Sequence, residues 1–108
     1  MVYIIITAKF PPSKAKEVGK RYLEVVKKYP LDKSLEKQIF RGAIRSTGDA
    51  ITTIGISEPR EGKMKEFILH QQEVEAMFHD IEGFQYTIDI WFNLVEALGV
   101  IGLEAPEE

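Results

Sequence analysis

The order of strand-like and helix-like segments restricts the fold of this chain more than any other feature. Residues 2–10 are β-branched and aromatic, and residues 84–92 alternate between apolar and polar side chains, so each segment predicts a strand. Residues 38–47 and 50–57 read as two further strands, and the Gly-Asp pair between them predicts a hairpin. Along the sequence, two of the four strands therefore come near the two ends and the other two come in the middle.

Two amphipathic segments fill the gaps between these strands. From Ser13 to about Tyr29, and from Lys63 to about Asp80, apolar residues recur every three or four positions and predict helices. Asn93 and Glu96 have the spacing of a capping box, which predicts a short final helix ending near Gly99. The apolar faces of the two long helices consist of Ala15, Val18, Tyr22, Val25 and Tyr29, and of Met64, Phe67, Gln71, Val74, Phe78 and Ile81.

The resulting order is strand, helix, strand, strand, helix, strand. Right-handed crossovers would place both helices on one face of a four-stranded antiparallel sheet, which is the ferredoxin-like arrangement of an α+β protein. We expect a single domain over residues 1–108, with residues 93–108 as a C-terminal extension.

The alternation also predicts which strand residues share a face. We expect the helix-facing core to contain Val2, Ile4, Ile6, Ala8 and Phe10, then Phe84, Tyr86, Ile88, Ile90 and Phe92, with Phe40, Ile44, Ile54 and Ile56 from the hairpin. The opposite face, part apolar and part polar, would suit the matching sheet of a partner. We expect it to carry Tyr3, Ile5, Thr7, Lys9, Ile39, Arg41, Ala43, Arg45, Thr53, Ser57, Gln85, Thr87, Asp89 and Trp91.

Composition excludes several classes of protein. The absence of cysteine excludes disulfides, thiolate nucleophiles, iron–sulfur clusters and cysteine-based zinc sites. A net charge of −3 argues against nucleic acid as a partner, and the run Ile4-Ile5-Ile6 is too short to span a membrane. The sequence shows no secretory signal, so we expect a cytoplasmic protein. Its richness in lysine, glutamate and isoleucine resembles thermophile usage.

The segment order, the length and the half-apolar second sheet face resemble the dimeric α/β-barrel superfamily. This superfamily includes antibiotic-biosynthesis monooxygenase-like, muconolactone-isomerase-like and stress-responsive barrel proteins, and the resemblance covers residues 2–94 at the level of pattern. It implies a homodimer whose two sheets face each other, and in several of these families a ligand cavity lies between sheet and helices.

His70 is the weak candidate for a catalytic residue. Glu66 and Glu73 lie four residues before it and three after it, within reach on the same side of the helix. One interpretation is a histidine made more basic by carboxylates, acting as a base or ligand at a cavity rim. The other is a boundary histidine in a solvated row of charges. Without paired histidines at metal-binding spacing, we expect no metal site.

Gln71 lies in the middle of an apolar helix face. A buried amide needs hydrogen-bond partners, so it either bonds the sheet or a tyrosine, or points into a polar cavity and contacts a ligand. Asp89 and Trp91 share a face of the last strand, and Arg41 and Arg45 have the matching parity. They form either an interface ion pair or an anion site with an aromatic wall.

Related enzymes and other users of the fold fit less well. The haem-degrading monooxygenases of the superfamily carry a histidine on the second helix, which His70 matches, but also an asparagine on the first strand and a tryptophan on the third. Here the first strand has no asparagine, and Trp91 is on the fourth strand. Residues 50–57 lack the aromatics of an RNA-recognition domain.

We therefore expect a homodimer, or a higher homo-oligomer, that binds a small molecule without a cofactor and without a clear catalytic signature. The alternative is a cofactor-free monooxygenase or isomerase acting on a small aromatic or polyketide-like substrate. The candidate ligand contacts are His70, Gln71, Asp89, Trp91, Arg41 and Arg45.

Overall fold

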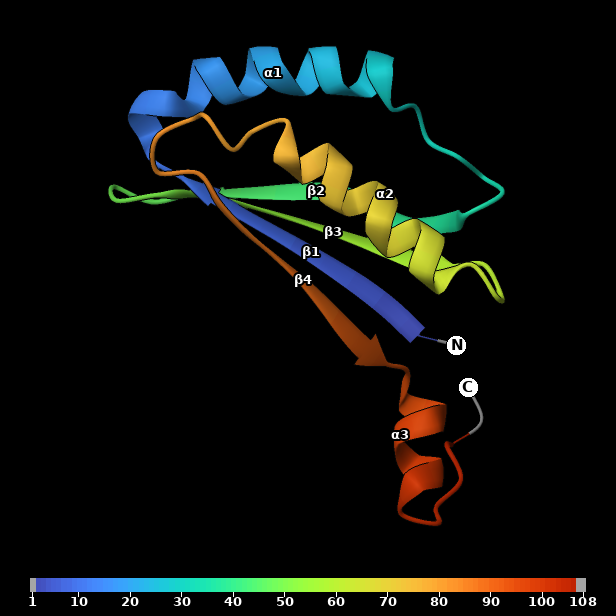
Figure 1. The fold of residues 1–108 in the computed structure, drawn as a ribbon. Helices are drawn as coiled ribbons and strands as arrows, with labels where there is room; N and C mark the ends of the chain where they lie inside the picture. Colours follow the sequence, from blue (N-terminus) through green and yellow to red (C-terminus); the bar gives the residue numbers. More distant parts are fainter. Residues whose placement is uncertain (1, 107–108) are drawn as a thin grey trace.

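A computed structural model describes residues 2–106 as a sheet with helices above one side of it (Figure 1). The sheet is antiparallel throughout, with strand order β2-β3-β1-β4, which confirms the predicted α+β class with four antiparallel strands. The elements are β1 (Val2–Phe10), a 3-10 turn (Pro12–Lys14), α1 (Ala15–Lys28), β2 (Glu36–Ser46), β3 (Ile51–Pro59), α2 (Met64–Ala76), β4 (Gln85–Phe92) and α3 (Leu94–Val100).

Local chemistry explains where several elements begin and end. Strand β1 ends just before Pro11 and Pro12. A proline has no amide hydrogen, so it cannot continue the hydrogen bonding of the sheet, but it can begin a helical turn. The Asn93 side chain accepts a hydrogen bond of 2.8 Å from the backbone N–H of Glu96, so the predicted cap of the final helix is confirmed. Helix α2 ends at Ala76, four residues earlier than the periodicity indicated, because the chain turns through residues 77–84 to reach β4.

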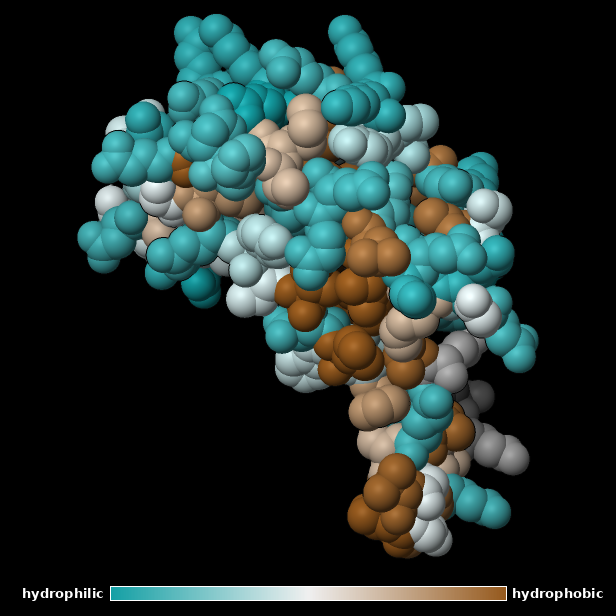
Figure 2. All heavy atoms as spheres, in the orientation of Figure 1, coloured by the Kyte–Doolittle hydropathy of each residue, from teal (hydrophilic) through white to brown (hydrophobic). Residues whose placement is uncertain are grey.

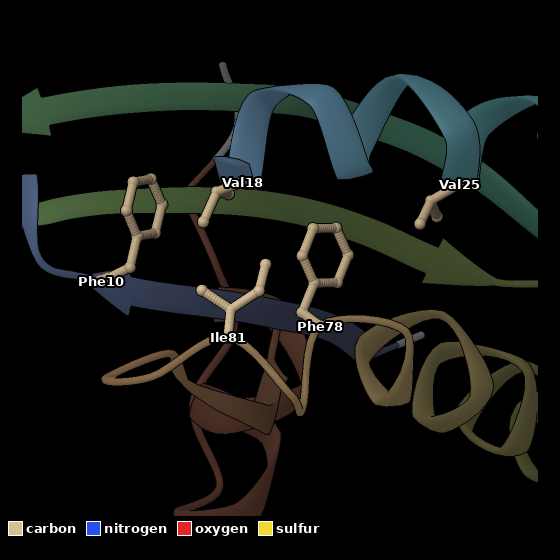
Figure 3. Packing of buried hydrophobic residues seen from close by; sticks show 5 residues of the cluster. All are labelled: Phe10, Val18, Val25, Phe78 and Ile81. Atoms are coloured by element: carbon tan, nitrogen blue, oxygen red, sulfur yellow. The ribbon is translucent and has the colours of Figure 1, made fainter. Parts of the chain in front are cut away.

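The core lies between α1, the turn after α2 and the end of β1. Figure 3 shows Val18 and Val25 of α1 approaching Phe78 and Ile81 from above, with Phe10 beside them. Each of these five side chains is buried. Phe84 stacks on Phe78 and on Phe10, with ring centroids 4.9 and 6.2 Å apart. Outside this cluster, Phe67 near the start of α2 and Ile4 near the start of β1 are also fully buried.

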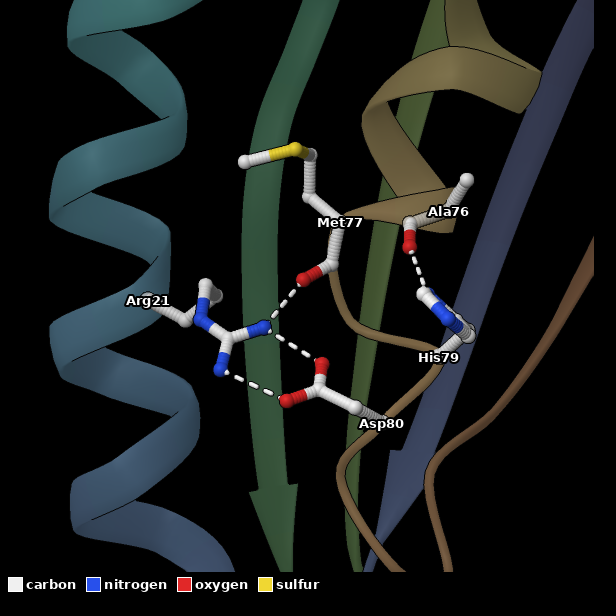
Figure 4. A network of polar contacts seen from close by, with 5 residues as sticks. All are labelled: Arg21, Ala76, Met77, His79 and Asp80. Atoms are coloured by element: carbon white, nitrogen blue, oxygen red, sulfur yellow. Dashed lines mark hydrogen bonds and ion pairs between the residues drawn. The ribbon is translucent and has the colours of Figure 1, made fainter.

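One polar contact holds α1 to the turn that comes after α2. The Arg21 guanidinium donates two hydrogen bonds to the Asp80 carboxylate, of 2.7 and 3.1 Å, and a third to the carbonyl of Met77 (Figure 4). The bonds from Arg21 lower the pKa of Asp80 to about 2. In the same turn the His79 ring contacts the Ala76 carbonyl. This network fixes the position of α1 above the core.

The register corrects the predicted faces of the central hairpin. We call the helix side of the sheet the inner face and the other side the open face. Ile54 and Ile56 pair with Thr7 and Ile5, so both lie on the open face, and Phe40 joins them there by pairing with Ile56. Thr53 and Ser57 are inner-face residues instead, because they pair with the buried Ala8 and Ile4.

Two irregularities in β2 explain why Arg41 also lies on a different face from the one predicted. The register slips between Gln38 and Phe40 and again between Phe40 and Ala43, and each β-bulge inverts the parity of the residues after it. Arg41 consequently faces the helices, where its Nε donates a hydrogen bond of 3.2 Å to the Tyr22 hydroxyl. Strict alternation therefore assigned Arg41 to the wrong face. Ile44 pairs with Thr53 on the inner face, as predicted.

The described chain is extended for its size. Its radius of gyration is 15.8 Å, whereas a compact domain of this length has about 13 Å. Helix α3 causes much of this difference, because it projects beyond the end of β4, and Figure 2 shows apolar surface both there and over the middle of the same side of the molecule. Within residues 2–106, no helix combines the length and apolar character needed to cross a lipid bilayer.

Candidate functional site

The inner side of α2 carries a buried carboxylate that the sequence interpretation missed. Glu75 is 8% exposed, and within residues 2–106 its side chain has no hydrogen bond or ion pair. Desolvation raises the pKa of this carboxyl to about 7, from an ordinary value of 4.5. A signal was present in the sequence, since Glu75 follows Gln71 by four residues and precedes Phe78 by three, on the face that packs against the sheet.

Near Glu75, one of two adjacent glutamines bonds to β4 and the other does not. Gln71 is half-buried and has no hydrogen bond to another described residue, so the predicted bond to the sheet or to a tyrosine is not formed. Its neighbour Gln72 takes that role, because its Oε1 accepts a hydrogen bond of 3.0 Å from the hydroxyl of Tyr86 in β4. This hydrogen bond connects α2 to β4, and Gln71 and Glu75 lie near Gln72 on the same helix.

A second polar group lies near the other end of α2. The Glu36 carboxylate is buried at the start of β2 and accepts a hydrogen bond of 2.8 Å from the buried hydroxyl of Ser57. Burial raises the pKa of Glu36, while this bond and the charge of His70 act in the opposite direction. Glu36 is thus held by a neutral donor in the interior, with a histidine close enough to influence it.

His70 is half-buried at the edge of this group. Its ring meets the ring of Tyr29 edge-on, with centroids 5.7 Å apart and an interplanar angle of 79°. Within the described chain it forms no ion pair with Glu66 or Glu73, and Glu66 instead approaches Lys63 at 3.5 Å. His70 of α2 therefore packs against Tyr29, the residue that follows α1, and lies close enough to Glu36 to influence the pKa of that carboxyl.

The other predicted contact residues divide between the two faces of the sheet. Asp89 and Trp91 lie on the open face, opposite Ile5 and Tyr3 of β1, and Arg45 lies on the same face opposite Thr52. Asp89 accepts a hydrogen bond of 3.1 Å from Thr87 and forms no ion pair with another described residue. Arg41 is on the inner face, so the predicted set of two arginines beside Asp89 is not assembled within one chain.

Two surface hollows have linings that do not include His70, Gln71 or Glu75. One, of about 390 Å³, is lined by Ser13, Lys14, Lys16, Glu17 and Lys20 at the start of α1. The other, of about 350 Å³, lies between the start of β1 and the C-terminal segment and is lined by Tyr3, Asn93, Leu94, Val95, Ala105 and Pro106. Among residues 2–106, no three histidine or carboxylate side chains are grouped so that they could hold a metal ion.

The described site therefore consists of α2 and the surfaces that this helix faces. Glu75 supplies a carboxyl poised near neutral pH, and Gln71 supplies an amide with free hydrogen-bonding capacity among the described residues. Comparison of the chain with protein-family models, with curated proteins and with solved structures finds no significant match.

Proposed function

We propose that this protein is a homodimeric small-ligand-binding protein of the dimeric α/β-barrel type, in which the open faces of two sheets pack against each other. The strand order β2-β3-β1-β4, with α1 and α2 on one side, supports a ferredoxin-like arrangement. In such a two-layer domain, the helices cover one side of the sheet and leave the other side for a partner.

The exposed area of the chain carries this proposal. The accessible surface is 7715 Å², whereas a folded monomer of 12.3 kDa exposes about 6,100 Å². The excess of about 1,600 Å² per chain is what each subunit of a stable homodimer typically buries. Much of the open face is apolar, with Tyr3, Ile5, Phe40, Ile54, Ile56 and Trp91 all partly or largely exposed.

Charge and α3 both favour a second copy of this chain as the occupant. The open face carries Lys9 and Arg45 as well as Asp89, so a two-fold axis would let opposite charges from the two copies pair. Helix α3 has only seven residues, and a helix of this length is not stable without packing. Its apolar residues are nevertheless exposed, with Val100 at 86%.

Sedimentation equilibrium at tens of micromolar tests the dimer. We expect the native chain to sediment as a dimer and Trp91→Asp to dissociate it, because the substitution places a charge in the apolar interface. Leu69→Asp is the matched control, since Leu69 is 54% exposed and Trp91 56%, but Leu69 lies on α2 away from the open face. A native chain that sediments as a monomer would refute the dimer.

Native mass spectrometry of the purified protein tests ligand binding. We expect a small molecule to remain with the folded protein and to be released on unfolding. Its chemical formula would then identify the ligand directly. Preparations from several hosts that carry no added mass, and that gain none from a metabolite extract, would contradict the proposal.

A second candidate function is catalysis as a cofactor-free monooxygenase or isomerase. It is favoured by Glu75, whose pKa of about 7 suits a general base at neutral pH. The test follows a retained ligand over time in air by mass spectrometry. Conversion that stops in Glu75→Gln or His70→Ala, while the ligand still binds, would support an enzyme, and an unchanged ligand in the native protein would exclude it.

A further inference from the structure

The inner side of β4 is an uncovered apolar surface beside α2. Tyr86, Ile88, Ile90 and Phe92 face the helices, because they pair with Ala8, Ile6, Ile4 and Val2 of β1. On β1, Ile4 and Ala8 are buried, yet on β4 Ile90 is 52% exposed and Phe92 65%. The helix side of β1 is therefore covered, whereas the helix side of β4 is open at Ile90 and Phe92. We call these four β4 side chains the β4 shelf, and Figure 2 shows apolar surface where β4 runs.

Glu75 lies at the border between this shelf and the covered strand. The bond between Gln72 and Tyr86 brings one flank of α2 to β4, and Glu75 follows Gln72 by one helical turn. Its carboxylate has no partner among the described residues, and neither oxygen is completely enclosed. An unpaired carboxylate so close to an apolar shelf is costly, and a group that pairs with it would remove that cost.

We propose that the β4 shelf and Glu75 together bind a small amine, with its ammonium group paired to the Glu75 carboxylate and its apolar body lying on the shelf. The shelf includes the ring of Tyr86, which is bonded to Gln72 on the flank of α2 that carries Glu75, and a cation is attracted to an aromatic face. Gln71 adds an amide oxygen that can accept a further N–H bond. The acidic net charge of −3 favours a cationic ligand over an anionic one.

This inference deepens the ligand-binding half of the proposed function and rests on it, but it does not need the dimer. It specifies a cationic head, because a carboxylate only accepts hydrogen bonds and a charged donor makes the strongest ones. It also specifies an apolar tail, because the shelf offers isoleucine and aromatic side chains. A ligand with the same tail and a neutral head should bind less tightly.

The test is a pair of probes of the same shape, 2-phenylethylamine and 2-phenylethanol, titrated into the full chain at pH 8. At this pH, Glu75 is mostly ionised and the amine is still protonated. Amide chemical shifts from ¹⁵N-labelled protein report both the affinity and the location of binding. We expect the amine to shift residues 71–75 and 85–92 and to bind at least about tenfold more tightly than the alcohol.

Two variants on the same helix assign this preference to Glu75. Glu75→Gln should weaken amine binding about tenfold and leave the alcohol unaffected, because it removes the charge and keeps the shape. Glu73→Gln, an exposed position two residues away, should change neither affinity. Four outcomes would each overturn the inference. They are equal affinities for the two probes, chemical-shift changes confined to other elements, no binding of the amine, and an amine affinity that Glu75→Gln leaves unchanged. A ligand retained in mass spectrometry alongside such a result would leave the proposed ligand-binding function standing.

Discussion

The two ends of β4 have similar side chains and opposite surroundings. Just before the strand begins, Phe84 stacks between Phe10 and Phe78 in the core. At the other end, Ile90, Trp91 and Phe92 are largely exposed, on both faces of the sheet. Apolar character alone therefore does not say which residues form the monomer core. The covered end holds the fold of one chain together, and the bare end offers surface to a ligand or to another chain.

The largest expected effect separates these two ends directly. Phe78→Ala should lower the free energy of unfolding by about 3–5 kcal/mol, because it leaves a cavity among the rings of the core. Phe92→Ala should cost less than about 1 kcal/mol, since that side chain is already exposed to water. Urea unfolding measures both values. An equal cost at the two positions would mean that the bare end is covered in solution.

The next effect concerns the buried carboxylate at the border of the covered region. Because burial raises the pKa of Glu75 to about 7 in the folded state, ionisation opposes folding as the pH rises from about 4.5 through 7. Glu75→Gln should therefore stabilise the fold by up to about 3 kcal/mol at pH 8 and by little at pH 4. Urea unfolding at both pH values checks this, with Glu73→Gln as the control. A gain of equal size at pH 4 would exclude ionisation as its cause.

A smaller effect is expected at the turn that leads into the covered end. Gly83 has a φ of 82°, and a Cβ atom there would lie 2.6 Å from Cγ of Pro11. Gly83→Ala should therefore cost about 1–2 kcal/mol. Gly19→Ala, in α1 with open space around it, should instead stabilise the fold by about 1 kcal/mol. Thermal unfolding of the two variants compares them, and a neutral Gly83→Ala would show that the turn relaxes freely.

The smallest effect is expected at the Arg21–Asp80 contact. The pKa of Asp80 is lowered to about 2 in the folded state, so its contribution is present above about pH 4 and lost as the pH falls towards 2. Asp80→Asn should lower the melting temperature slightly at pH 7 and leave it unchanged near pH 2. The exposed neighbour Glu82→Gln is the control. A difference that persists unchanged at pH 2 would exclude the charge as its source.

Much of the fold could be predicted from local pattern, because strands and helices differ in the period of their apolar residues. The inner faces of β1 and β4 follow the even positions, and the cap at Asn93 follows from residue type. The hairpin faces could not be predicted, because Thr53 and Ile54 both fit a strand and only pairing with β1 decides between them. The bulges that turn Arg41 towards Tyr22 depend equally on tertiary pairing.

The candidate site was predicted less completely than the fold. His70 and Gln71 were identified by residue type, since a histidine or an amide on an apolar stripe is conspicuous. Glu75 was overlooked because glutamate is common on helices and is normally solvated. Its burial follows from the placement of α2 over the sheet, which no local pattern encodes. Helical spacing alone places Glu75 near the apolar face of the helix but does not show whether its side chain is buried.

The central position of β1 has a consequence for how the chain is made. Strand β1 is synthesised before β2, β3 and β4, and it pairs on one side with β3 and on the other with β4. Val2 can therefore pair only after Phe92, its partner in the register, has been made. During translation, β1 can join the β2–β3 hairpin first, while its other edge remains unpaired until β4 has been released. An apolar strand edge exposed in this way favours association between nascent chains. Slow synthesis between β3 and β4 should thus lower the yield of folded protein.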